Sequence, residues 1–310
     1  MKSAPRNNKR KAGAESGSWL LAPLLVVFYL LVAGCSASTG EVTSDSELDR
    51  SLTIAHAGWS ESAALANLTK VVFEDELDYE VKLVSTGPEA AFEGVARREF
   101  DAFQGIWRPR HNGLISEHEG EINMLGRWLY GETRASLAAP SYMEVRRIED
   151  LEGAGRALIL DPEASAFGEI PGEVFERHDL EPSVFPDSSA MMDEVGRLYE
   201  AEEPFVFFAY SPHWMNLRYD FDYLEGAELL ENMNRPSTLH SAARAGLGLE
   251  DPAAYVLLDS MVLTEYHIES LQLSIHEAQN PREGARDWAE ANEALIESWV
   301  EAARSAQTRD

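Results

Sequence analysis

Cysteine is almost absent from this sequence, which has one, Cys35, in 310 residues. A single cysteine cannot close a disulfide within the chain, so apolar burial must hold the fold together. The length is sufficient for two compact domains of ordinary size. Cys35 therefore calls for an explanation other than a structural crosslink.

Basic residues are also scarce, and lysine is the scarcest of them. The chain has 26 Lys and Arg against 54 Asp and Glu, a formal net charge of −28. Residues 1–34 hold five of the basic residues and one acid, so without them the net charge is −32, with Lys70 and Lys82 as the last lysines. Such a surface repels nucleic acid and anionic lipid, which argues against both as partners. The acid excess is typical of proteins bathed in high salt, although a GC-rich genome also favours arginine over lysine.

Familiar catalytic and metal-binding motifs are missing as well. The sequence has no G-x-S-x-G elbow, no P-loop and no H-E-x-x-H. His56, Ser60 and Glu61 lie close together in the sequence and could be imagined as a nucleophile with its base. Strand geometry puts His56 and Trp59 on opposite faces, which argues against this arrangement. The segment HNGLISEHEGE (111–121) offers His and Glu ligands without a recognisable spacing. We predict no metal site and no cofactor, and an enzyme is the least favoured function.

The one long apolar run lies at the N-terminus. A basic stretch, MKSAPRNNKRKAG, precedes LLAPLLVVFYLLVAGC, a pattern that predicts a secretory signal peptide over residues 1–34. Its ending resembles the bacterial lipobox, in which the cysteine is lipidated, so Cys35 is the predicted lipid anchor. Polar residues 35–50 then form a flexible tether. We expect an extracytoplasmic lipoprotein, in the periplasm or at the cell surface; an uncleaved signal anchor is the alternative.

Strand and helix patterns alternate from residue 51 onward. Apolar runs predict strands at 52–58, 79–86 and 100–107, with helices between them that start at Ser60, as a capping residue, and after Gly87. This order implies a parallel sheet covered by helices.

A second series of strands and helices follows, and residues 237–304 are expected to be mostly helical. The economical interpretation is an α/β protein of two lobes, with crossings near 135–140 and 208–212. The predicted strands are 134–142, 156–162 and 204–210, the predicted helices are 165–177 and 188–202, and the predicted lobes are 51–136 plus 213–304 and 137–212.

Aromatic residues stand at the ends of three predicted strands. Trp59, Trp107 and Tyr210 would all lie at the carboxyl edge, where open α/β sheets bind ligands. Each ring alone is also explained by core packing. Together, rings with negative π-faces can surround a cation that donates no hydrogen bonds, such as a quaternary ammonium group.

Several segments resemble the glycine betaine/choline/carnitine substrate-binding proteins of ABC transporters, over residues 52–302. The most specific segment is YSPHWMNLRYDFDYLE (210–225); GPEAAFEGVARREFDAFQGIWRPRHN (87–112) and RWLYGETRASLAAPSY (127–142) match further parts. The resemblance implies a two-lobed periplasmic-binding-protein fold (type II-like), with parallel or mixed sheets and two crossovers. It also implies a ligand of the quaternary ammonium class, and an ABC permease and ATPase complex as partners.

This chain departs from many members of that family at three places. Tyr210 replaces a tryptophan, Leu263 replaces another box tryptophan of some betaine binders, and Asp161–Ser165 lacks a glycine-rich turn. Glu61 stands near the place of an acid in the choline-type branch. Glycine betaine, choline and carnitine therefore stay open as ligands.

Two histidines and one rival function complete the expectations. His213 is expected either to bind a ligand carboxylate or to lock the crossover. His111 is expected to lie in a surface loop, with contact to the ligand as the alternative. A subunit of the same fold that senses a ligand without transport is the main alternative function.

Overall fold

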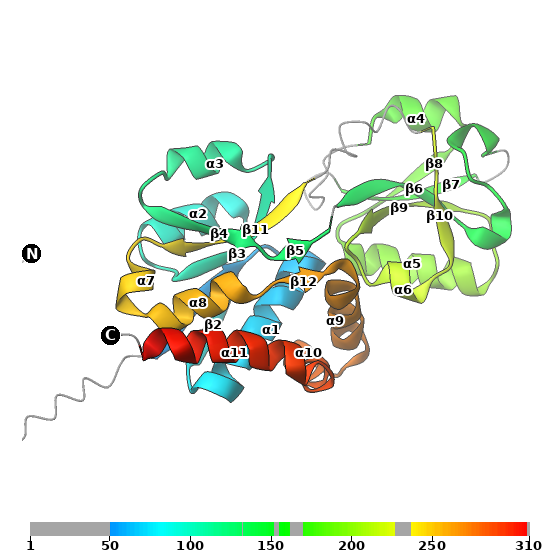
Figure 1. The fold of residues 1–310 in the computed structure, drawn as a ribbon. Helices are drawn as coiled ribbons and strands as arrows, with labels where there is room; N and C mark the ends of the chain where they lie inside the picture. Colours follow the sequence, from blue (N-terminus) through cyan, green and yellow to red (C-terminus); the bar gives the residue numbers. More distant parts are fainter. Residues whose placement is uncertain (1–49, 132, 152–154, 162–169, 227–236, 309–310) are drawn as a thin grey trace, which may run out of the picture. The chain divides into compact units, whose positions relative to one another are not determined.

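The computed structural model describes residues 50–131, 133–151, 155–161, 170–226 and 237–308 (Figure 1). The predicted signal peptide, Cys35, all of the tether except Arg50, and most of the turn at 161–165 lie outside these ranges. Within them, no helix is long and apolar enough to cross a membrane.

The first of two five-stranded sheets has the order β2-β1-β3-β11-β4. Strand β1 pairs in parallel with β2 and β3, as predicted, whereas β11 runs antiparallel to β3 and β4. The sheet is therefore mixed. Its strands are β1 (Ser51–His56), β2 (Glu80–Ser85), β3 (Ala102–Arg108), β4 (Ile122–Arg127) and β11 (Thr238–Arg244).

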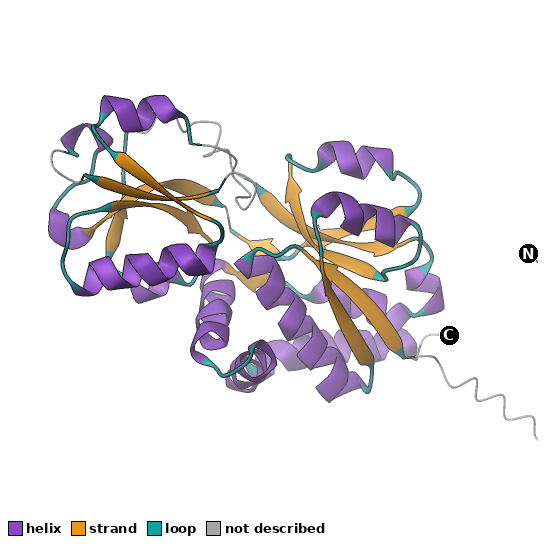
Figure 2. Cartoon of the chain, turned by 180° about the vertical axis from the view of Figure 1, so that it is seen from behind, coloured by secondary structure: helices purple, strands orange, loops and turns teal. Residues whose placement is uncertain are grey.

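Both faces of this sheet are covered, because successive side chains point to opposite sides of a strand. Ile54 and Trp107 join the core formed with helix α1, whereas Ala55 and Ile106 join the core formed with α2 and α3. Figure 2 shows helices on both sides of the strands. The helices are α1 (Ser60–Leu77), α2 (Pro88–Ala96) and α3 (Asn112–Glu117).

The second sheet has the order β10-β6-β9-β7-β8 and is also mixed. Strand β9 is buried at every residue and lies between β6, antiparallel, and β7, parallel. Helix α5 contributes Met191 and Val195 to the core that packs against this sheet. The elements are β6 (Arg134–Pro140), β7 (Arg156–Leu160), β8 (Glu181–Phe185), β9 (Val206–Ser211), β10 (Phe221–Tyr223), α4 (Gly172–Arg177), α5 (Ser188–Glu200) and α6 (Met215–Arg218), with 3-10 turns at Ser141–Met143 and Ile148–Asp150.

Residues 245–307 are mostly helical, as predicted, but the same prediction was wrong for β11. Strand β11 fills the place between β3 and β4, so sheet pairing determines its conformation. Helices α10 and α11 pack beside α1 (Figure 1). The remaining elements are α7 (Leu247–Glu250), α8 (Pro252–Ser260), α9 (Glu265–Glu277), α10 (Pro281–Ala291), α11 (Glu293–Gln307) and a small sheet of β5 (Leu129–Tyr130) with β12 (Leu263–Thr264).

The chain does not leave the second sheet at Pro212, where the prediction ended that lobe. Strand β9 ends at Ser211, but Trp214 and Met215 then belong to the second core, and β10 pairs with β6. The second lobe thus continues to at least Leu224, a member of the same core.

The polar and aromatic residues after β9 attach the second core to helix α9. Asn216 Nδ2 donates to Glu269 Oε1 at 2.8 Å, and the Trp214 ring stacks on His276 with 4.0 Å between centroids. Both partners lie on α9, which also contributes Ile268 to the first core. The cluster that begins at Tyr210 is therefore an attachment, not a crossing.

Candidate functional site

A hollow of about 320 Å³ lies where strands of both sheets end. This volume is near the lower limit of about 300 Å³ for small-molecule sites. The segments that follow β1 and β2, the ends of β7 and β9, and the start of α5 form its wall. The lining residues are Ala57, Gly58, Trp59, Ser60, Thr86, Gly87, Pro88, Leu160, Asp187, Ser188 and Tyr210.

Trp59 is the residue that caps α1, and the prediction of Ser60 as the cap was wrong. Trp59 has extended backbone angles and supplies no side-chain cap. The turn is fixed instead by Ser62, whose Oγ accepts from the Ala57 N–H at 3.0 Å and donates to the Gln104 carbonyl. A Cβ on Gly105 would lie 2.7 Å from Ser62 Oγ, so this close approach of helix and strand requires glycine.

Trp107 and His111 stand directly behind Trp59. The Trp107 ring meets Trp59 edge-on, with 6.2 Å between centroids and an 86° interplanar angle. Trp107 is 2% exposed and is not a lining residue. His111 stacks on Trp59 at 6.0 Å, and its Nδ1 accepts the Trp107 backbone N–H at 3.1 Å.

His111 is buried, contrary to the prediction of a surface-loop histidine. Burial, followed by the charge of Arg110, lowers the pKa of His111 to about 4. The imidazole is therefore neutral at physiological pH. It supports Trp59 and Trp107 together.

Tyr210 reaches the same hollow from the second sheet. Its hydroxyl donates to Ser188 Oγ at 3.4 Å, and its ring lies 4.8 Å from that of His213. Burial, and then the charge of Glu61, raise the pKa of Tyr210 well above its usual value. The phenol is therefore neutral. The charge of Glu61, on α1, acts on Tyr210, a residue of the second sheet.

Glu61 is 1% exposed, and its Oε1 has no hydrogen-bond partner among the described residues. Burial raises the pKa of Glu61 to about 7, although its own backbone N–H and the Trp107 side chain partly offset this. The carboxyl group is consequently balanced between its neutral and charged forms at neutral pH. It is not a lining residue, but its charge acts on Tyr210, which does line the hollow.

His213 is also fully enclosed, behind Tyr210 and Ser188. Burial, and then the neighbouring His276, lower the pKa of His213 to about 3. Leu263, at the position of a possible further ring, lies in the first core. Of the five predicted ligand-binding residues, Trp59 and Tyr210 line the hollow, whereas Trp107, Glu61 and His213 surround it.

Three helices begin at this hollow, namely α1, α2 and α5. The caps of α1 and α2, Trp59 and Gly87, provide no side-chain hydrogen bond, whereas Asp187 accepts the Ala190 N–H at 2.8 Å on α5. Helix N-termini carry partial positive charge and favour an anionic group. The wall thus combines aromatic rings, which suit a cation, with helix ends that suit a carboxylate. Asp187 and Ser188 were not predicted as site residues, because their only signal in the sequence is a common helix start.

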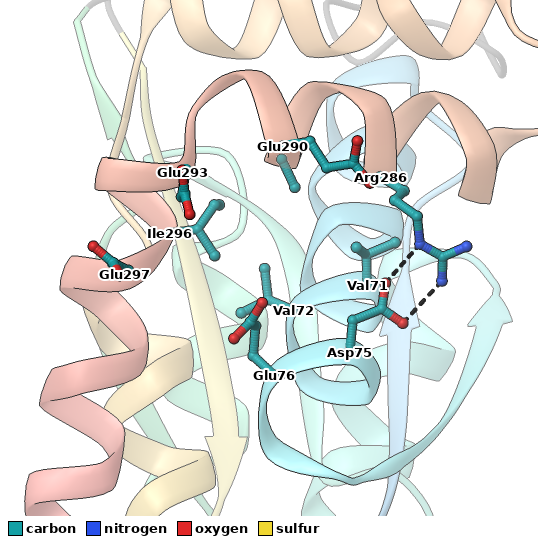
Figure 3. A pocket seen from close by; sticks show the side chains of 10 residues that line it. Val71, Val72, Asp75, Glu76, Arg286, Glu290, Glu293, Ile296 and Glu297 are labelled. Atoms are coloured by element: carbon teal, nitrogen blue, oxygen red, sulfur yellow. Dashed lines mark hydrogen bonds and ion pairs between the residues drawn. The ribbon is translucent and has the colours of Figure 1, made fainter.

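A larger hollow of about 400 Å³ lies between α1, α10 and α11 (Figure 3). Its floor is aliphatic, and Arg286 Nε donates to Asp75 Oδ2 at 2.7 Å. It contains no aromatic ring, and its acids would repel any carboxylate. We name it the acidic groove; its lining residues are Val71, Val72, Asp75, Glu76, Arg286, Ala289, Glu290, Glu293, Ile296 and Glu297.

No group of three or more His, Cys, Asp or Glu side chains in the described ranges is arranged to hold a metal ion. The segment at 111–121 therefore does not assemble a metal centre within that part of the chain.

Two mixed α/β sheets with a ligand-sized hollow at their strand ends define a two-lobed substrate-binding protein. Residues 50–291 match the family of substrate-binding domains of ABC-type glycine betaine transport systems, and the chain belongs to this family. It is a family of transporter binding proteins and not of enzymes, and such proteins work outside the cytoplasm.

Individual relatives agree with this assignment. The chain is 24% identical over 114 residues to the glycine betaine/carnitine transport binding protein GbuC of Listeria monocytogenes, a match that spans 37% of each chain. The structure is similar to lactococcal OpuAC, closed on glycine betaine, with a TM-score of 0.66, 25% identity and coverage of 81% and 100% of the two chains. The structure is also similar to an ABC-transporter choline-binding protein in complex with choline, with a TM-score of 0.63, 18% identity and coverage of 84% of this chain and 99% of that one. This likeness shows the shared fold.

Proposed function

We propose that this protein captures a quaternary ammonium osmolyte, of the glycine betaine, choline or carnitine class, and delivers it to an ABC transporter for uptake. The observation that carries the proposal is that Trp59, which follows β1 of the first sheet, and Tyr210, in β9 of the second, line one hollow. The family assignment and the relatives that bind glycine betaine or choline support the same ligand class.

The physical basis is the weak hydration of a methylated cation. A trimethylammonium group donates no hydrogen bond and loses little when it leaves water, whereas a desolvated contact with an aromatic face contributes about 2 kcal/mol. Trp59 and Tyr210 supply two such faces. Trp107 reinforces Trp59 from behind, because the two rings pack against each other nearly at a right angle.

The other end of the ligand meets a mixed electrostatic environment. The starts of α1 and α2 favour a carboxylate, as in betaine or carnitine. Ionised Glu61 would favour choline, which is a cation without a carboxylate. Since the pKa of Glu61 is about 7, the preference between these ligands should depend on pH.

Anchoring and partners follow from the same proposal. Lipidation of Cys35 would keep the domain near its permease and ATPase, tethered by residues 35–50. Ligand binding between lobes stabilises a closed form, and the permease would recognise that form. A sensing role without transport would use the same closure, and uptake assays in cells distinguish the two.

The test is a calorimetric titration of the purified protein with glycine betaine, choline, carnitine and proline betaine. We expect saturable binding of at least one of the four. Proline, which resembles proline betaine but lacks its N-methyl groups, is the matched control and should bind far more weakly. Absence of binding to all four quaternary compounds would refute the proposed function.

A further inference from the structure

Ser188, the first residue of α5, stands between the hollow and a buried histidine. It lines the hollow together with Trp59 and Tyr210. Its Oγ lies 3.2 Å from His213 Nε2 and 3.4 Å from the Tyr210 hydroxyl.

The backbone fixes which nitrogen of His213 carries the proton. The Met215 N–H, which can only donate, lies 3.2 Å from His213 Nδ1, so Nδ1 must accept. A neutral imidazole has one N–H and one acceptor nitrogen, so the proton is on Nε2. Burial of His213 at 1% exposure keeps the ring neutral, and His213 Nε2–H therefore donates to Ser188 Oγ.

These two contacts occupy both acceptor sites of the Ser188 hydroxyl and leave its hydrogen free to donate. A hydroxyl accepts two hydrogen bonds and donates one. Ser188 Oγ accepts from His213 and from Tyr210, and it has no further hydrogen-bond partner among the described residues. Its O–H is thus available to an acceptor inside the hollow.

We propose that Ser188 donates a hydrogen bond to the oxygen of the bound ligand, and that His213 is the positioning residue that orients this hydroxyl. The ligand oxygen is a carboxylate in betaines and a hydroxyl in choline. The N-terminus of α5 adds partial positive charge at the same place. This inference rests on the proposed function, because it assumes that the rings hold the cationic end.

The inference explains why His213 is buried although it does not line the hollow. It acts through Ser188, so its own replacement should change recognition of the ligand oxygen and not of the methylated nitrogen. That separation distinguishes orientation of the hydroxyl from general support of the fold.

The experiment compares Ser188→Ala with the wild-type protein by calorimetry, using glycine betaine, choline and tetramethylammonium. Tetramethylammonium has no oxygen and is the internal control. We expect the dissociation constant to rise about 10- to 100-fold for betaine, whose acceptor is charged, and about 3- to 10-fold for choline. Binding of tetramethylammonium should change less than about twofold, since the rings are intact.

His213 is tested with two replacements. His213→Gln keeps an N–H donor near the Nε2 position and should bind all three ligands within a few-fold of wild type, whereas His213→Leu should reproduce the pattern of Ser188→Ala. A uniform weakening for all three ligands in Ser188→Ala, or no weakening at all, would overturn the inference. If the wild-type protein binds neither glycine betaine nor choline, the same comparison is made with carnitine or proline betaine, whichever binds; if neither of these binds either, the proposed function itself fails and the inference fails with it.

Discussion

The acidic groove and the hollow at the strand ends differ in both size and wall chemistry. The acidic groove, at about 400 Å³, is the larger, but it offers glutamates, an aliphatic floor and an Arg286–Asp75 ion pair. The smaller hollow, at about 320 Å³, offers two aromatic faces and the starts of three helices. Volume alone would favour the groove. The chemistry of the wall instead favours the smaller hollow as the ligand site.

The strongest way to break this comparison is Trp59→Ala. It removes an aromatic face from the smaller hollow, and we expect affinity for the preferred quaternary ligand to fall on the order of 100-fold. Trp59→Phe should lose much less, because a ring remains. Calorimetry of both variants gives the result, and equal affinity in Trp59→Ala and wild type would remove this residue from the site.

Trp107→Ala should have the next largest effect on binding. Loss of the ring that supports Trp59 should cost about 2 kcal/mol of affinity, roughly a 30-fold rise in dissociation constant. Because Trp107 is buried, stability should also fall by about 3–5 kcal/mol.

Trp299→Ala is the matched control for Trp107→Ala. Trp299 is also buried in the first core, but on α11 and away from the hollow. Denaturant unfolding should show a similar loss of stability for both variants, whereas only Trp107→Ala should weaken binding. Equal affinities in the two variants would contradict a role for Trp107 in the site.

The ionisation of Glu61 gives a test of the smaller hollow in which ligand affinity depends on pH. The pKa of Glu61 is raised to about 7, so its carboxylate ionises as pH rises from 6 to 8. A bound cation favours the ionised form, and choline should therefore bind up to about 10-fold more tightly at pH 8 than at pH 6.

Glu61→Gln removes the ionisation and should flatten this profile. Betaine carries its own carboxylate, so its affinity should not rise with pH in the wild-type protein. Calorimetry of both ligands at pH 6, 7 and 8 measures the difference. A choline profile that is unchanged in Glu61→Gln would assign the pH dependence to another group.

The smallest effect is expected in the acidic groove. Arg286→Ala breaks a partly exposed ion pair with Asp75 and should cost less than about 1 kcal/mol of stability. Ligand affinity should change less than twofold by calorimetry. A large loss of binding in this variant would mean that the two hollows have been assigned the wrong roles.

Local patterns in the sequence were sufficient for most of the fold. Apolar alternation defined β1 to β3 with α1 and α2, and the continuous apolar run of β9 indicated a strand buried on both faces. Strand β11 was missed because its sequence, TLHSAAR, mixes polar residues with alanine, and its conformation depends on partners about 115 and 135 residues earlier in the chain.

The site could be predicted only where a residue has a strong chemical character of its own. Trp59 and Tyr210, which line the hollow, stood out because aromatic residues at strand ends are conspicuous. Ser188 was missed because a serine that starts a helix is ordinary, and its role arises from His213, 25 residues away. His111 was placed in a surface loop because its burial depends on stacking with Trp59, from a different segment.

The central claim is that the smaller hollow selects a methylated nitrogen through its rings. The most direct measurement is a calorimetric titration of the wild-type protein with two matched pairs, choline with ethanolamine and glycine betaine with glycine. The account predicts that at least one quaternary member binds, and that its unmethylated partner binds at least about 30-fold more weakly. Equal binding within both pairs, or binding of the unmethylated amines alone, would contradict it.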